Sequence, residues 1–248
     1  MATYAFRLDG ADTVGCVVTV VSPHLVAVDA AWDDGPDAGA WIASRLGPFG
    51  ASVGHAVPLG YPAYAVVRIA PDDLHTEFEC LPALEILLDV LSRFSGEQAV
   101  HCGTWEGWGW WYDTGADPRM AAGMGVGVAW PEGADRPAQE EIDRALATAR
   151  EELAAERVEC PDVEPLDLPY RRYYLWTGPL RSATGFRHQP HDPPSLIWPE
   201  DRSWFVGVPI YTTEIAVGGT TVVVDAVIAD PRLNAHLATP DDVLDIDD

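Results

Sequence analysis

The stretch Pro82-Ala-Leu-Glu-Ile-Leu-Leu-Asp-Val-Leu-Ser-Arg-Phe94 is closely followed by Ala99-Val-His-Cys-Gly-Thr-Trp105. In the first segment, leucines recur at steps of three and four residues, which predicts a helix with one buried stripe. Pro82 suits the first turn of that helix, and Gly96 suits its end. The second segment is predicted to be a strand. This succession of helix and strand favours an α+β fold with mixed sheets and helices.

Apolar spacing and turn residues elsewhere in the chain predict further strands and helices. Strands are expected over residues 14–21, 25–31, 64–69, 126–130, 173–177 and 204–208. Helices are expected over residues 37–46, 137–157, 179–184 and 220–229. The helix over 137–157 alternates acids with arginines, which is typical of a solvated face. Thr220 is the expected cap of the last helix, and Asp230-Pro231 its expected end.

The order of these elements is similar in the two halves of the chain. Each half runs strand, short helix, Pro-rich loop, strand, loop and helix, as two similar α/β lobes joined by a long helix would. An internal duplication and a coincidence among alternating elements both remain open. The expected boundaries give an N-terminal α/β lobe over 1–136, a connecting helix and acidic linker over 137–165, a C-terminal α/β lobe over 166–240 and an acidic tail over 241–248.

The composition excludes several classes of protein. The chain has no lysine, and its 39 acidic side chains outnumber its arginines to give a formal net charge of −24. Without lysine there is no Schiff base, no covalently held pyridoxal cofactor and no Walker-type phosphate loop, so no cofactor is expected. The negative charge opposes binding to nucleic acid, where affinity comes from neutralising phosphates, and docking on anionic membranes.

Cysteine usage and targeting signals indicate where the protein acts. The cysteines Cys16, Cys80, Cys102 and Cys160 are widely spaced and form no CxxC pair. The first residues lack the pattern of a signal peptide, and no apolar stretch approaches the roughly 20 residues that span a bilayer. We therefore expect a cytoplasmic protein with reduced thiols, and the skew from lysine and asparagine toward arginine, alanine, glycine and proline suggests a G+C-rich bacterial genome.

Trp105-Glu-Gly-Trp-Gly-Trp-Trp-Tyr112 is the densest local signal. In a strand, Glu106 and Trp108 would face one side and Trp105 the other. A row of indoles beside a carboxylate can stack on sugar rings or anchor a partner's side chains. The alternative is an aromatic core strand whose glycines relieve crowding.

Trp198-Pro-Glu-Asp-Arg-Ser-Trp204 is the second signal. Arg202 can lie on an indole face as a cation–π pair while Asp201 orients its guanidinium group. The segment can equally be an exposed turn before the Trp204 strand, with Asp201 bonded to its own backbone. We expect at least two of Trp105, Trp108, Trp198 and Trp204 to share one cluster.

Two weaker patterns involve Ser52 and a histidine pair. Gly50-Ala-Ser-Val-Gly54 matches a nucleophile elbow, but a helix is expected before it, and Pro58 and Pro62 oppose a helix after it. Catalysis at Ser52 is therefore not expected. His188 and His191 could ligate a metal, but no third or fourth ligand is evident, so no metal site is expected.

Five motifs of the chain are distinctive when taken together: Trp105-Glu-Gly-Trp-Gly109, Gly178-Pro-Leu180, Ser195-Leu-Ile-Trp-Pro-Glu-Asp-Arg-Ser-Trp204, Val217-Gly-Gly219 and Ala229-Asp-Pro-Arg-Leu233. They resemble an uncharacterised protein family of G+C-rich actinobacteria. The resemblance spans residues 105–233 and implies a lineage but no mechanism, since the family has no established activity. This chain departs from it at Pro209-Ile-Tyr211, where such proteins tend to carry Glu-Ile-Asp, so a site built on those acids is in doubt here.

These observations favour a non-catalytic, acidic interaction protein that engages a basic protein partner, with an immunity or antitoxin role as one concrete form. Its contact residues would be Trp105, Glu106, Trp108, Trp198, Asp201, Arg202 and Trp204. The alternative is a hydrolase-like enzyme or a binding module for a small polar or sugar-like ligand. In that case Glu106 and Asp201 are the candidate carboxylates beside the indoles.

Overall fold

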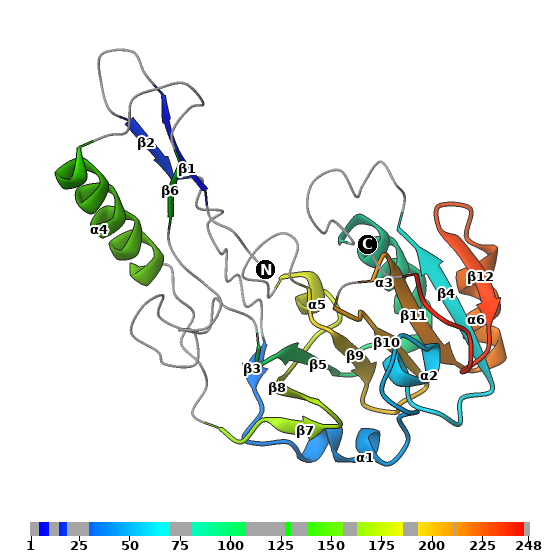
Figure 1. The fold of residues 1–248 in the computed structure, drawn as a ribbon. Coiled ribbons are helices and arrows are strands. Elements are labelled where there is room, and N and C mark those ends of the chain that lie inside the picture. Colours follow the sequence, from blue (N-terminus) through cyan, green and yellow to red (C-terminus); the bar gives the residue numbers. More distant parts are fainter. Residues whose placement is uncertain are drawn as a thin grey trace. The chain divides into compact units, whose positions relative to one another are not determined.

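The structure is a computed structural model, and it describes residues 5–9, 15–18, 30–69, 81–107, 127–129, 138–155, 163–185, 193–210 and 212–245 (Figure 1). The chain forms two compact units. The first comprises Met1–Pro23 and Gly107–Cys160, and the second comprises His24–Glu106 and Pro161–Asp248. Each unit is a folded body with its own sheet, and the two are described separately.

The second unit is built on a nine-stranded sheet. Its strands run in the order β12-β4-β11-β10-β9-β5-β8-β3, with β7 paired to β8, and every pair is antiparallel. The strand bounds are β3 (Ala31–Trp32), β4 (Ala63–Arg68), β5 (Val100–Trp105), β7 (Leu166–Leu168), β8 (Arg171–Gly178), β9 (Leu196–Pro199), β10 (Trp204–Gly207), β11 (Glu214–Gly219) and β12 (Asn234–Ala238). Strands from the two segments of this unit, His24–Glu106 and Pro161–Asp248, are therefore interleaved within one sheet.

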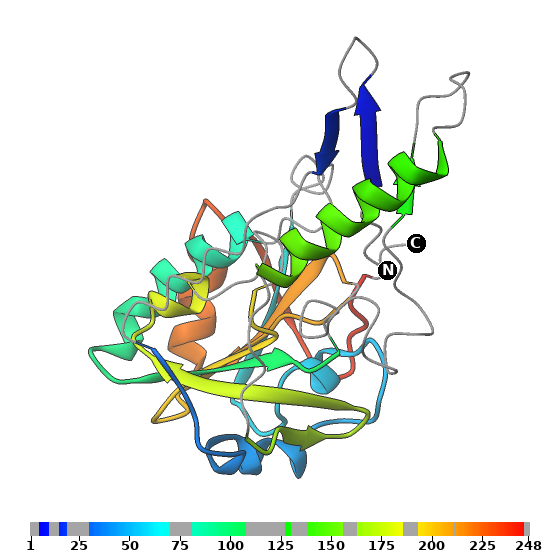
Figure 2. The ribbon, with the colours of Figure 1, turned by 90° about the vertical axis from the view of Figure 1, so that its left-hand side faces the viewer.

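In the described part of the chain, three helices pack on the face of this sheet that we call the helical face. α3 (Leu81–Ser95) and α6 (Thr221–Ala229) lie side by side in Figure 2. The short helix α5 (Ser182–Gly185) contributes Ala183 to the same core. The core beneath them consists of large buried side chains from helices and strands: Leu84, Leu87, Leu91, Trp176, Ile197, Trp204, Val206 and Val223. The leucines at steps of three and four residues form the buried stripe of α3, so the periodicity predicted from the sequence is confirmed.

Short helical turns and loops cover the other face, which we call the loop face. The turns are η1 (Asp37–Gly39), α1 (Ala40–Ala43) and α2 (Val53–Ala56). Their core consists of Ile42, Val53, Val57, Tyr64, Tyr173, Leu175, Leu196, Trp198 and Phe205. Side chains alternate along the strands between the two cores, since Leu175 packs on the loop face and Trp176 on the helical face.

The first unit contains a three-stranded sheet in the order β2-β1-β6 together with the helix α4. Its elements are β1 (Ala5–Asp9), β2 (Gly15–Val18), β6 (Gly127–Ala129) and α4 (Gln139–Ala155). At the start of α4, the carboxylate of Glu141 accepts a hydrogen bond from the backbone N–H of Ala138 at 3.2 Å. This bond occupies one of the N–H groups that have no partner within the helix itself.

Most elements predicted from the sequence are present, and the α+β class is confirmed. Gly96 has φ +59° after α3, and Thr220 caps α6 by accepting a hydrogen bond from the N–H of Val223. The structure adds β1, β7, β9, β11, β12 and α2, which were not expected. Most of the strand expected over 25–31 lies outside the described residues. Within the part of the chain that is described, no helix is long and apolar enough to span a membrane.

The structure does not confirm two similar lobes joined by a long helix. β5, from before that helix, pairs directly with β8 and β9, from after it. The expected boundaries around residues 137–165 therefore do not divide this sheet. The physical reason is that each half contributes strands whose backbone groups are hydrogen-bonded to strands of the other half.

Candidate functional site

Trp105 and Glu106 lie at the end of β5, and each interacts with an arginine of β8. The Trp105 ring packs against the core of the loop face, and the guanidinium carbon of Arg171 lies 5.8 Å from its centroid. Arg172 binds both carboxylate oxygens of Glu106, at 2.7 and 2.8 Å. The candidate acid thus belongs to an inter-strand ion pair. Trp108, the third residue of this motif proposed for binding, lies outside the described residues.

Trp198 and Trp204 are core residues on opposite faces of the sheet, with exposed fractions of 1% and 0%. Trp204 packs under the helices, and its Nε1–H donates a hydrogen bond to Ser95 Oγ at 3.1 Å. Trp198 belongs to the loop-face core, against which Trp105 also packs. The expectation that these indoles contact a ligand or partner is corrected here, because neither ring reaches the surface.

The sequence left two alternatives open for Asp201 and Arg202, a turn stabilised by Asp201 and a cation–π contact of Arg202, and the structure shows both. Asp201 Oδ1 accepts a hydrogen bond from the backbone N–H of Ser203 at 2.9 Å, as in a turn. Burial favours a higher pKa for Asp201, but hydrogen bonds from Ser203 and Gln98 outweigh it and lower that pKa. The guanidinium carbon of Arg202 lies 4.9 Å from the ring centroid of Trp41, a cation–π contact. Its aromatic partner therefore comes from α1, which the local motif does not contain.

Ser52 precedes α2, so the expectation that no helix follows it is wrong. Pro58 and Pro62 lie beyond this single turn and do not prevent it. Ser52 also forms an isolated bridge with Val243. Among the described residues, no hydrogen bond joins its hydroxyl to a histidine or a carboxylate. That Ser52 is not a nucleophile stays a prediction.

The two histidines considered as metal ligands, His188 and His191, lie outside the described residues. In the described ranges, no group of three or more histidine, cysteine, aspartate and glutamate side chains is arranged to hold a metal ion.

A surface-exposed aromatic group lies elsewhere on this unit, and the sequence analysis did not identify it. Phe49 is 55% exposed and Tyr170 is 79% exposed, and their ring centroids are 4.6 Å apart. The ring of Phe49 also meets that of His55 at 5.0 Å, edge to face. We call Phe49, His55 and Tyr170 the aromatic surface. The loop between α1 and α2, α2 itself and the β7–β8 turn bring the three residues together.

Tyr170 is held in an unusual backbone conformation. Leu168 pairs with Arg171 in the β7–β8 hairpin, so Pro169 and Tyr170 form its two-residue loop. Tyr170 has φ 72°, in the left-handed region where glycine or asparagine is usual. Such a conformation costs a bulky residue on the order of 1–3 kcal/mol. The exposed ring recovers little of this cost through burial.

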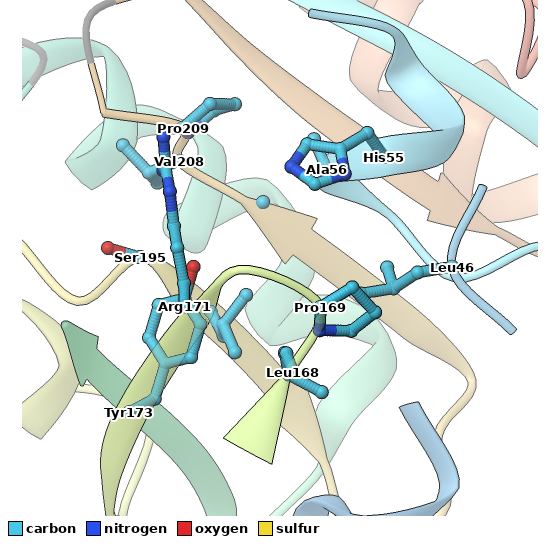
Figure 3. A pocket seen from close by; sticks show the side chains of 12 residues that line it. Leu46, His55, Ala56, Leu168, Pro169, Arg171, Tyr173, Ser195, Val208 and Pro209 are labelled. Carbon is cyan, nitrogen blue, oxygen red and sulfur yellow. The ribbon is translucent and has the colours of Figure 1, made fainter. Parts of the chain in front are cut away.

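A small pocket adjoins the aromatic surface, since His55 both lines it and contacts Phe49 (Figure 3). Its polar side chains come from His55, Arg171, Tyr173 and Ser195, while leucine, valine and proline side chains supply much of the remaining wall. Its volume is about 30 Å³. Small-molecule sites usually measure roughly 300–1,000 Å³, so this pocket suits a water molecule or the tip of a side chain.

The surroundings of this pocket shift the pKa of two of its polar side chains. Burial, assisted by the nearby Arg171, lowers the pKa of His55, so its imidazole is neutral at physiological pH. The His55 Nδ1 atom is buried and has no hydrogen-bond partner among the described residues. Burial raises the pKa of Tyr173, against the opposing effect of Arg171. Among the described residues, no aspartate or glutamate lines the pocket.

Three polar side chains, from β5, β8 and the end of β3, are hydrogen-bonded to one another on the loop face. Thr177 Oγ1 donates a hydrogen bond to Asp33 Oδ1 at 2.7 Å and lies 2.7 Å from His101 Nδ1. Because the threonine proton is directed to Asp33, His101 Nδ1 must be the donor in the second bond. The His101 ring stacks on Trp198 with centroids 5.4 Å apart. This chain of groups fixes the histidine ring and leaves its Nε2 as a proton acceptor when the ring is neutral.

Comparisons with protein-family models, curated proteins and solved structures found no match. The resemblance of the sequence motifs to an actinobacterial family therefore stays a prediction, and the function must be argued from these residues themselves.

Proposed function

We propose that this chain is a non-catalytic, acidic interaction protein that binds a basic protein partner through its aromatic surface. The observation that supports this most directly is the contact between Phe49 and Tyr170, two large side chains that remain exposed. Exposed apolar groups that meet one another are typical of protein–protein contact sites, whereas single exposed apolar residues are ordinary.

The conformation of Tyr170 adds to this argument. Folding alone gains little from an exposed ring on a residue with a positive φ. Binding would gain more, since tyrosine is among the residue types that dominate binding energy at interfaces. The neighbouring pocket can receive the tip of one partner side chain beside the aromatic rings.

The charge of the chain indicates the kind of partner. A formal net charge of −24 produces a long-range field that attracts basic proteins and accelerates their association. An immunity or antitoxin protein that neutralises a basic toxin remains one concrete form of the proposal. It rests on charge and on the predicted lineage.

The alternative, an enzyme or a binding module for a sugar-like ligand, has less support from the geometry. Glu106 is engaged by Arg172 through both carboxylate oxygens, and Asp201 bonds its own turn. The indoles of Trp198 and Trp204 are buried. Each feature that motivated the alternative thus has a structural role.

The test begins with capture of partners from the native lysate at low salt, followed by purification of the captured basic protein. Its association rate should fall steeply as the Debye length shrinks from roughly 30 Å at 0.01 M to roughly 10 Å at 0.1 M salt. The double variant Phe49→Ala/Tyr170→Ala should weaken binding by about a hundredfold, as expected for two central aromatic contacts. Val222→Ala, at a residue 67% exposed on α6, is the matched control and should bind normally.

Equal affinity of the double variant and the control would contradict the aromatic surface as the contact. Binding that ignores salt would contradict the role of the charge. Circular dichroism of each variant distinguishes lost contacts from lost folding.

A further inference from the structure

Two arginines converge on the single indole ring of Trp41, in a protein that is otherwise strongly acidic. The guanidinium carbon of Arg202 lies 4.9 Å from the ring centroid of Trp41, and that of Arg45 lies 5.6 Å from it. Trp41 is in turn fixed edge-on against Trp198 and Phe205, at 6.3 and 6.0 Å. Both guanidinium groups therefore lie against one aromatic ring, which neighbouring rings hold in place.

Tyr61 belongs to the same group of residues. The charges of Arg45, Arg202 and Asp201 all act on the pKa of its hydroxyl. Its ring lies against Gly218, where a Cβ would come 2.8 Å from Tyr61 Cδ2. Burial is the main cause that raises the pKa of Tyr61, with the two arginines opposing it. The phenol therefore stays protonated at neutral pH and remains a hydrogen-bond donor.

Polar hydrogens in this cluster have no acceptor. Trp41 Nε1 and the Tyr61 hydroxyl are both buried, and within the described part of the chain neither has a hydrogen-bond partner. A buried donor without an acceptor costs about 1–3 kcal/mol. Two such donors beside two arginines constitute a site that is rich in hydrogen-bond donors.

We propose that Trp41, Arg45, Tyr61 and Arg202, which we call the Trp41 cluster, bind a phosphate group. Guanidinium groups and an indole N–H only donate hydrogen bonds, and a phosphate offers several acceptor oxygens and the opposite charge. Its binding neutralises the exposed guanidinium groups and offers acceptors to the unpartnered donors. The phosphate can be free or carried as a monoester, and the experiment separates these sources.

Other features of the cluster agree with this assignment. Arg202 has φ 57°, a strained conformation for a side chain with a Cβ, although glycine would fit this turn without strain. Asp201 offsets one positive charge, but its Oδ1 is already bonded to the Ser203 N–H. Both arginine side chains are exposed, so an incoming anion meets them first.

The test is calorimetric titration of the full chain with inorganic phosphate, at an ionic strength held constant with sodium chloride. Phenyl phosphate, sulfate and acetate form parallel arms. We expect saturable binding of phosphate, a saturable rise in Tm and weaker binding of acetate, which has fewer acceptor oxygens. Tighter binding of phenyl phosphate assigns the site to a monoester, and tighter binding of inorganic phosphate assigns it to the free ion.

Variants locate the binding. Arg45→Gln and Arg202→Gln should each weaken phosphate binding by about tenfold or more, because each removes a charge-assisted hydrogen bond. Tyr61→Phe should weaken it by a smaller factor while it preserves the packing of the ring. Arg144→Gln, on the exposed side of α4 in the other unit, is matched in charge and should bind as the wild type does.

Three results would overturn the proposal: no saturable phosphate binding, equal responses to phosphate and acetate, or unchanged binding in Arg45→Gln and Arg202→Gln. The exposed arginines are suitable for this purpose because their replacement leaves the buried core intact. Measurement of Tm for each variant without phosphate verifies this.

Discussion

Arg172 clamps Glu106 from the neighbouring strand: its Nε lies 2.7 Å from Glu106 Oε2, and a terminal nitrogen lies 2.8 Å from Oε1. The backbone completes the link, since the N–H of Glu106 donates to the carbonyl oxygen of Arg172 at 2.8 Å. A carboxylate next to tryptophan, which the sequence suggests as a catalytic acid, is thus a tie between β5 and β8.

Glu106→Gln should therefore reduce stability and have no effect on phosphate binding. We expect the free energy of unfolding to fall by about 1 kcal/mol, a modest value because solvent screens the half-exposed Arg172. Arg172→Met should have a similar effect. Urea unfolding of both single variants and of the double variant measures the coupling, and strictly additive losses would contradict the ion pair.

The sequence predicted those elements whose signals are local. The leucine stripe and Gly96 predict α3, and Thr220 predicts the start of α6. β9 was not predicted, because Trp198-Pro199 lies at its end and the motif suggests a turn. β12 was not predicted either, since it is an edge strand with mostly exposed side chains and no alternating apolar pattern.

The functional candidates depend on contacts between distant segments, which explains why local motifs miss them. Phe49 and Tyr170 meet only because the loop after α1 reaches the β7–β8 turn, and neither residue belongs to a motif. The cation–π role of Arg202 was correctly anticipated as one alternative, but its partner Trp41 comes from another segment. A tyrosine directly after a proline in a tight turn is the one local signal available for Tyr170.

Gly207→Ala should destabilise the protein because β10 and α2 lie in close contact there. A Cβ at Gly207 would lie 2.3 Å from the carbonyl oxygen of Ala56, so backbone must move. We expect a loss of roughly 1–3 kcal/mol in the free energy of unfolding. Gly50→Ala is the control, since a Cβ there meets nothing within 4 Å. Equal unfolding curves for the two variants would show that the contact is looser than described.

His55 should make stability depend on pH. Its pKa is lowered from 6.5, so the unfolded chain binds this proton more tightly than the folded protein does. The wild type should therefore lose stability as the pH falls below 6.5, through the window that ends at the lowered pKa. His55→Gln should show a shallower loss in chemical denaturation as the pH falls below 6.5. Identical slopes for the wild type and His55→Gln would contradict the burial effect.

Tyr170 should show a trade-off between stability and binding. Asparagine tolerates the left-handed region better than tyrosine, so Tyr170→Asn should raise the free energy of unfolding by roughly 0.5–1 kcal/mol. The same change removes the most exposed ring of the aromatic surface, so affinity for the basic partner should fall by about tenfold or more. Phe49→Ala is the informative comparison, because Phe49 has no positive φ and its loss should weaken binding without any gain in stability. If Tyr170→Asn were instead less stable than the wild type, the ring would be needed for folding, and its exposure would no longer argue for a partner.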